Sequence, residues 1–363
     1  MDLERLVKLT NVKDKNEIQK AIRKTAKEKK IPPTIVAEKV TGYYEYLFSF
    51  KQLSGVSEII KLEGTVGNIT RRMYFFKDIH RVIGECDSYE KEILYGRMIR
   101  FNKWFVDILE TSPKFTDSFI EYHPKFVHGR YFEDIFYQRS ERRLSLRKHQ
   151  GTIIDIVAHL EPCFSNLKKK CPVKTGRVHF VDMRRFTNEQ FVIDQIKNRD
   201  KATLRFFFAK PKKTSFWVKY MFDKYFKKSK INIEFKRSQL SDKWDTYVTD
   251  YLTERYNDEY FVKIYGMTCR AWKEGWDNLL LTGFVILLYA PLLDLYTIAR
   301  MFKKFNDKDH PYAQNIIVYT GGTHIKDMVK FLEDILHFDR IDLGIKNLDK
   351  QCLDISSLPL PLF

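Results

Sequence analysis

The chain has 363 residues, which is enough for one large domain or two ordinary ones. Hydrophobic residues make up 44% and charged residues 31%, a balance that excludes an intrinsically disordered chain. The net charge of +17 indicates a polyanionic neighbour, such as nucleic acid, an anionic membrane surface or an acidic protein. The alternative is the lysine-rich codon usage of an AT-rich genome.

The five cysteines are scattered and form no CxxC pair. This pattern argues against a zinc ribbon and against a disulfide framework, and it predicts a reducing compartment. Residues 1–30 are charged throughout, so no secretory signal peptide is expected and the chain is predicted not to be secreted.

The first 150 residues are predicted to be mostly helical, because few of their apolar runs alternate with period two. Residues 16–30 form a basic amphipathic pattern that ends before Pro32 and is either an arm for a partner or a solvated first helix. Further helical patterns cover residues 34–50, 68–82, 88–109 and 131–148.

The stretch from Leu279 to Phe338 organises the rest of the chain. It contains an apolar run over 279–293, an apolar strand pattern over 315–320, a Gly321-Gly322 turn and a helical pattern over 325–336. The uncharged run 278–293 is shorter than the ~20 residues of a membrane-spanning helix, so we predict a buried helix there and expect no membrane association.

Two runs, Val178–Asp182 and Ile316–Thr320, are predicted to be interior strands, because both have apolar residues on successive positions. The predicted fold class is α/β, with a small, mostly parallel sheet flanked by helices. We expect a helical region over residues 1–150, an α/β domain over 151–340 and an extended C-terminal tail over 341–363. The apolar, proline-bearing end of that tail either docks on a neighbouring molecule or folds back.

Basic and aromatic residues alternate most densely between residues 201 and 236. Such a pattern is typical of a groove for single-stranded nucleic acid, and equally of a helix with one aromatic and one lysine face. The candidate residues for binding nucleic acid or another anion are Lys210, Lys212, Lys213, Lys219, Lys227 and Lys228.

One set of side chains has the composition of a chemical site. His179, Asp182 and Arg184 lie at the end of one predicted strand, and His324 follows the other. Two parallel strands would bring these ends together at the edge where open sheets bind ligands. Imidazole with carboxylate can transfer protons, and two imidazoles with a carboxylate can hold a metal. We expect His324 to be neutral at pH 7, because it lies in the first turn of a helix.

A structural role is the alternative for these four residues, with Arg184 pairing with Asp182 and His324 packing at its turn. No P-loop, GxGxxG, HExxH, GxSxG or zinc-deaminase motif occurs in the chain. The sequence therefore names no cofactor and no metal.

Three segments resemble sequence motifs of uncharacterised proteins of large nucleocytoplasmic double-stranded DNA viruses. They are Leu295–Phe302 (LYTIARMF), Asn315–Ile325 (NIIVYTGGTHI) and Arg177–Arg184 (RVHFVDMR). That group is in turn faintly similar to TraB and erythromycin-esterase-like proteins, whose late strand also ends in Gly-x-x-His. The enzyme superfamily carries an early Gly-x-x-His strand as well, and no such motif occurs before Gly151. The resemblance thus implies a scaffold that lacks half of an enzyme-like site.

Three hypotheses about function follow. The first is a structural or interaction protein of a large DNA virus, a minor capsid or internal component of the virion that binds other viral proteins without catalysis. It would be found in the virion or in the cytoplasm of the infected cell. The second is a TraB- or esterase-like hydrolase that uses His324 with His179 and Asp182. The third is a nucleic-acid-binding protein without sequence specificity.

Overall fold

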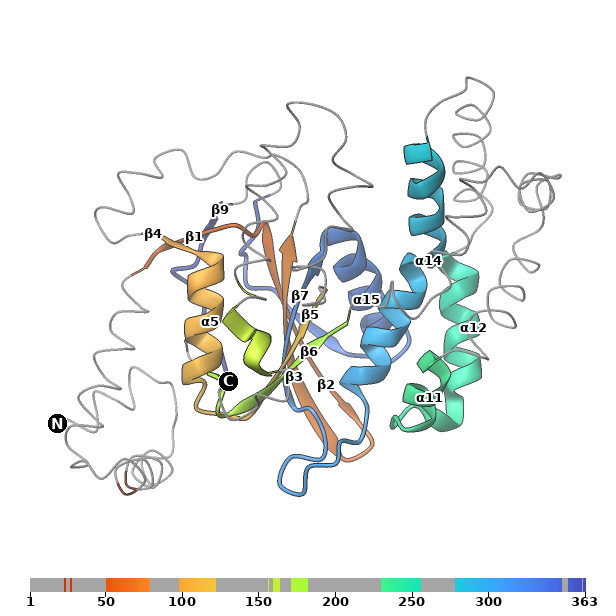
Figure 1. Cartoon of the computed structure of the whole chain (residues 1–363), viewed down its shortest axis with the longest axis horizontal. Helices are drawn as coiled ribbons and strands as arrows, with labels where there is room; N and C mark the ends of the chain where they lie inside the picture. Colours follow the sequence, from red (N-terminus) through yellow and green to blue (C-terminus); the bar gives the residue numbers. More distant parts are fainter. Residues whose placement is uncertain are drawn as a thin grey trace.

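The computed structural model describes residues 23, 27, 50–78, 98–121, 156, 159–163, 171–181, 230–255, 278–347, 352–360 and 362–363 (Figure 1). For residues 161, 230, 231 and 278–289 it describes the backbone alone. Asp182, Arg184 and the six candidate lysines between residues 210 and 228 lie outside this part of the chain.

A six-stranded mixed sheet forms the centre of the molecule, in the order β6-β5-β7-β3-β2-β8. The first four of these strands run parallel, and β2 and β8 continue the sheet in antiparallel fashion. The strands are β2 (Glu58–Val66), β3 (Ile69–Asp78), β5 (Thr116–Ile120), β6 (Gly176–Phe180), β7 (Asn315–Gly321) and β8 (Asp339–Ile341).

Helices cover both faces of this sheet, so the chain is a mixed α/β protein. In Figure 1, α14 and α15 lie on one side of the sheet, with α11 and α12 beyond α14, and α5 lies on the other side. The helices are α5 (Phe101–Thr111), α11 (Lys230–Lys236), α12 (Trp244–Arg255), α14 (Asn278–Met301) and α15 (Gly322–Asp334), with short 3-10 turns η2 (Glu161–Cys163) and η5 (Ser241–Lys243).

Successive side chains of each strand enter two separate cores, as the pleat of a strand requires. Met73 and Phe75 of β3 belong to the core beneath α14 and α15. Tyr74 and Phe76 belong to the core beneath α5. All four are 0% exposed, so β3 is buried on both faces.

The structure corrects the helix predicted over residues 68–82, because Ile69–Asp78 is the strand β3. Burial on both faces removes the period-two alternation that marks a half-exposed strand, and the sequence therefore gave no strand signal. The expected helical region over 1–150 is wrong for residues 50–78, which hold β1 (Gln52–Ser54), β2 and β3. The helical pattern over 88–109 is confirmed from Phe101 onwards by α5 and is wrong for residues 98–100, which form a strand.

The strand predicted around Val318 is confirmed, since β7 lies between β5 and β3. The strand predicted around Val178 is also present as β6, but the described residues do not place it in the interior of the sheet. In the described part of the chain β6 has one neighbour, β5, and it ends the sheet. Its Arg177 and Phe180 are partly exposed, which fits a strand at an edge.

The buried helix predicted over 279–293 is confirmed as a helix by α14, which continues through Pro291 to Met301. Residues 291–299 are all buried. Among the described helices, none is both long enough and apolar enough to cross a bilayer.

The C-terminal tail folds back onto the molecule. Its strand β9 (Cys352–Asp354) joins β1 and β4 (Met98–Arg100) in a small three-stranded sheet. Leu358, Leu360, Leu362 and Phe363 are buried in the core beneath α5. Of the two alternatives that the sequence left open for the tail, the structure therefore shows the second.

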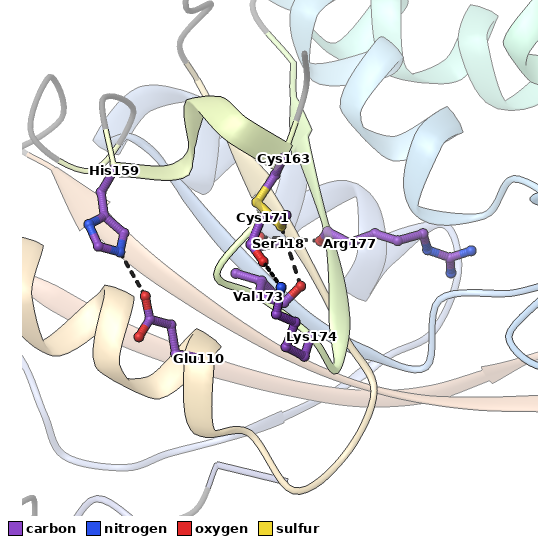
Figure 2. Close-up of a disulfide and its surroundings, with 8 residues drawn as sticks. All are labelled: Glu110, Ser118, His159, Cys163, Cys171, Val173, Lys174 and Arg177. Carbon is purple, nitrogen blue, oxygen red and sulfur yellow. Dashed lines mark hydrogen bonds and ion pairs between the residues drawn. A yellow bond between two sulfur atoms is a disulfide. The ribbon is translucent and has the colours of Figure 1, made fainter. Parts of the chain in front are cut away.

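The structure contradicts the expectation of a chain without a disulfide framework, because Cys163 and Cys171 form a disulfide (Figure 2). Cys352 is disulfide-bonded as well. The expectation that disulfides would be missing rested on irregular spacing alone, and spacing does not reveal which cysteines a fold brings together.

Candidate functional site

Two groups of ionisable side chains lie on the α14 side of the sheet. We call Asp117, Arg177, His179 and Arg300 the sheet-edge cluster, and Glu121, Tyr251, Asp294 and His324 the strand-end cluster. The sequence predicted a single constellation with His179 and His324 together. Strand β5 lies between β6, which carries His179, and β7, which leads into the helix α15 that carries His324, so each histidine has its own partners.

The parallel register of β5 and β6 builds the sheet-edge cluster. Asp117 lies opposite Arg177, and Phe119 lies opposite His179. Arg177 binds the Asp117 carboxylate with two nitrogens, at 2.7 Å from Nε to Oδ1 and 3.0 Å from Nη2 to Oδ2. Such bidentate geometry is the strongest form of arginine–carboxylate pairing.

Both ring nitrogens of His179 have internal partners. Its Nε2 lies 2.8 Å from Oδ1 of Asp117, and its Nδ1 lies 3.0 Å from Nη2 of Arg300. A guanidinium can only donate, so Nδ1 must accept and the single ring proton must be on Nε2, which donates to Asp117. The ring is also stacked between Phe119 and Phe305, at 4.5 Å and 5.1 Å between centroids.

The electrostatics agree with a neutral His179. Burial is the main cause that lowers the pKa of His179, to about 4, and the nearby Arg300 and Arg177 lower it further against the opposing effect of Asp117. Burial alone would raise the pKa of Asp117. Hydrogen bonds from His179 and Arg177 outweigh that effect and lower the pKa of this carboxyl, which therefore remains ionised.

The strand-end cluster lies where β5 and β7 end and α15 begins. His324 donates from Nδ1 to Oδ1 of Asp294 at 2.6 Å, and its Nε2 lies 3.4 Å from Oε1 of Glu121. The Tyr251 hydroxyl donates to the other oxygen of Asp294 at 2.8 Å. The backbone N–H of Gly321 donates to Oε2 of Glu121 at 2.8 Å, which fixes that carboxylate at the end of β7.

His324 is protonated, contrary to the sequence-based expectation of a neutral ring. Burial opposes its charge, but the carboxylates of Glu121 and Asp294 outweigh burial and raise the pKa of His324 to about 10. The sequence argument counted the positive end of the helix dipole alone. One carboxylate in hydrogen-bond contact, Asp294, and a second at 3.4 Å, Glu121, act more strongly than that partial charge.

Asp327, one turn further along α15, completes the surroundings of this cluster. Burial, followed by the charge of Asp294, raises the pKa of Asp327 to about 6. Arg255 of α12 lies 2.8 Å from its carboxylate, at Oδ2, and opposes that rise.

Sequence reasoning identified both histidines and missed their partners. Asp294 carried the clearest signal, since it is a lone carboxylate in a long apolar helix and a buried carboxylate has to be paired. Asp117 and Glu121 gave no such signal. Asp182 and Arg184, which were expected beside His179, lie outside the described residues.

This arrangement leaves little open chemistry. Each histidine has both ring nitrogens within reach of an internal partner, so neither presents a free lone pair to a substrate. Across the described residues, no group of three or more His, Cys, Asp or Glu side chains could hold a metal ion.

Comparison with known proteins returned no match to this chain among protein-family models, curated proteins or solved structures.

Proposed function

We propose that the chain is a structural or interaction protein of a large double-stranded DNA virus, packaged in the virion, and that it works without catalysis. One observation supports the absence of catalysis in this proposal. Every ring nitrogen of His179 and His324 contacts another side chain of the protein. These contacts join β5, β6, α14 and α15, so the two histidines have a structural role in this proposal.

The viral part of the proposal rests on sequence. The segments Leu295–Phe302 and Asn315–Ile325, which resemble proteins of large DNA viruses, form the end of α14 and the β7–α15 turn. These are the elements that hold the strand-end cluster. Other viral proteins are the proposed partners, and the net charge of +17 favours an acidic surface or nucleic acid among them.

Quantitative mass spectrometry of purified, protease-treated particles tests the proposal. The chain should be recovered in a fixed ratio to the major capsid protein after removal of surface-bound material. Abundant chain in infected-cell lysate with none in the particles would overturn packaging. A matched non-packaged viral protein of similar abundance is the control for carry-over.

A hydrolase of the TraB or esterase-like kind is the second candidate, favoured by the position of His324. It lies at the carboxyl ends of parallel strands, where α/β enzymes place their sites, with two carboxylates beside it. The purified chain and its His324→Gln variant should be compared on a panel of ester and peptide substrates. Turnover by the parent chain that the variant loses would establish this candidate over the first.

A further inference from the structure

The disulfide between Cys163 and Cys171 links two layers of the fold (Figure 2). Cys163 ends η2, and Cys171 lies five residues before the first residue of β6. Both cysteines are partly exposed, and exposure is one of the conditions for thiol–disulfide exchange.

The η2 side of this link is anchored to α5. Leu160 is 0% exposed in the core beneath α5. His159 contacts Glu110 of α5 (Figure 2), with 2.7 Å between Nε2 and Oε1. The first cysteine is therefore attached to the helix layer.

The other side of the link is the start of β6. The backbone N–H of Thr116 donates to the carbonyl oxygen of Thr175 at 3.1 Å. A Cβ on Gly176 would lie 2.3 Å from the carbonyl oxygen of Thr116, so only glycine allows β6 to approach β5 this closely. The second cysteine therefore lies just before a closely packed edge strand.

This edge strand is also held by side-chain contacts, since Arg177 binds Asp117 and the carbonyl oxygen of His310, and His179 binds Asp117 and Arg300. In the described part of the chain β6 pairs with β5 alone, and it carries Arg177 and His179 of the sheet-edge cluster. Within the described residues, the disulfide is a covalent connection between the segment that leads into this strand and η2.

The reduced state also fits the structure. Sγ of Cys171 lies 3.3 Å from the carbonyl oxygen of Val173. A disulfide sulfur has no proton to donate, whereas a thiol at the same place would donate to that oxygen. A reduced Cys171 thus finds a hydrogen-bond acceptor already in position.

We propose that Cys163–Cys171 is a reversible thiol–disulfide exchange site whose oxidation state sets how firmly β6 is held against the α5 layer. The reactant is a small thiol of the glutathione class. Its thiolate attacks one sulfur, the S–S bond breaks and a mixed disulfide forms. A second thiol then displaces the protein sulfur. Two electrons and two protons pass to Cys163 and Cys171, and the two small thiols become one disulfide. The proposal does not depend on the viral assignment.

Hydrogen exchange of the full chain, equilibrated in reduced or oxidised glutathione buffers, tests this site. Amides of residues 176–180 should exchange about tenfold faster or more in the reduced protein, because local opening no longer has to work against the cross-link. Amides of 316–320 in β7 serve as the internal control and should not change. Equal exchange of β6 in both buffers would overturn the proposal.

Variants assign the effect to this disulfide. Cys352→Ser removes the other bonded cysteine of the described residues, and its β6 should keep the full redox response. Cys171→Ser should exchange like the reduced parent in both buffers. Mass mapping of alkylated thiols gives an independent readout if that variant does not fold. Cys163 and Cys171 found as free thiols in the oxidised buffer would also reject the proposal.

Discussion

The carboxylate of Asp294 and the ring of His324 meet through a 2.6 Å hydrogen bond between α14 and α15, although 30 residues separate them in sequence. Asp294 is 0% exposed, so its charge has been taken out of water and depends on His324 and Tyr251 for compensation. This contact joins the buried helix to the β7–α15 turn.

Replacement of Asp294 by asparagine should strongly destabilise the protein. The change leaves His324 charged and buried with one carboxylate fewer, and removing one member of a buried pair typically costs about 3–5 kcal/mol. The free energy of unfolding, measured by urea denaturation, should fall by about 3 kcal/mol. Asp334→Asn, at an exposed position of α15, is the control and should change little. Equal stability of the two variants would show that the contact is not needed.

Replacement of Leu295 by alanine tests the core beneath α14. Leu295 is 0% exposed and packs in the core that includes β3 and β7, so the change leaves a cavity. Losses of about 2–5 kcal/mol in the free energy of unfolding are typical of such sites. Ile233→Ala is the matched control, because Ile233 is 51% exposed and its truncation should cost less than about 0.5 kcal/mol.

The part of the fold that sequence reasoning recovered is the part with clear periodicity. The α14, β7 and α15 elements follow one another as an apolar run, a strand pattern and a helical pattern, and each is present. The strand β3 was missed because Met73 to Phe76 are buried on both faces and do not alternate. Local pattern carries no information about a strand of this kind beyond its apolar character.

The candidate site was recovered only as single residues. His179 and Asp117 are 62 residues apart, and they meet through the register of β5 and β6. His324 and Asp294 meet through the docking of α14 on the sheet. Register and docking are set by packing between distant segments, so no motif within either segment could have named the partner.

The free energy of unfolding should fall both at acid pH and at alkaline pH, and the two limbs of this dependence have different causes. The pKa of His324 is raised from 6.5 to about 10. Its contribution to the free energy of unfolding is therefore complete below pH 6.5 and is lost as pH rises through about 10. The pKa of His179 is lowered from 6.5 to about 4, so its contribution is complete above pH 6.5 and is lost as pH falls through about 4. Ionised Asp117, whose pKa is lowered, adds to the acid limb.

Urea denaturation between pH 3.5 and 10.5 at steps of about half a unit measures both limbs. His324→Gln should flatten the alkaline limb and leave the acid limb in place. His179→Gln should reduce the acid limb alone. Parallel curves for the parent and both variants would contradict these assignments.

Two glycine-to-alanine substitutions should lower the free energy of unfolding by different amounts. A Cβ at position 176 would meet the backbone oxygen of Thr116 at 2.3 Å, and backbone within a sheet cannot move away. A Cβ at position 322 would meet the Lys77 side chain, at 2.7 Å from Cε, and a lysine chain can rotate. Gly176→Ala should therefore lower the free energy of unfolding by about 1–3 kcal/mol, and Gly322→Ala by less. A larger loss for Gly322→Ala would indicate that β6 is not held as closely as described.

The last prediction concerns the protonation of His179. Arg300 lowers the pKa of His179 by its charge and donates to Nδ1, while Asp117 raises that pKa. Arg300→Gln should therefore raise the pKa of His179 towards 6.5, because protonated Nδ1 would no longer face a cation. Asp117→Asn should lower it further, since the imidazolium would lose its carboxylate. The chemical shift of the His179 ring, followed by NMR from pH 3.5 to 8, measures the rise in Arg300→Gln, and a ring that stays neutral down to the acid end of this range shows the fall in Asp117→Asn.

Arg255→Gln is the control for this titration, because Arg255 pairs with Asp327 near the other cluster. This substitution should lower the stability of the protein and leave the His179 titration unchanged. A purely packing role for Arg300 would lower stability without moving the His179 pKa. Opposite shifts in the Arg300 and Asp117 variants are expected when the ring lies between an arginine and a carboxylate, and equal titrations would contradict that arrangement.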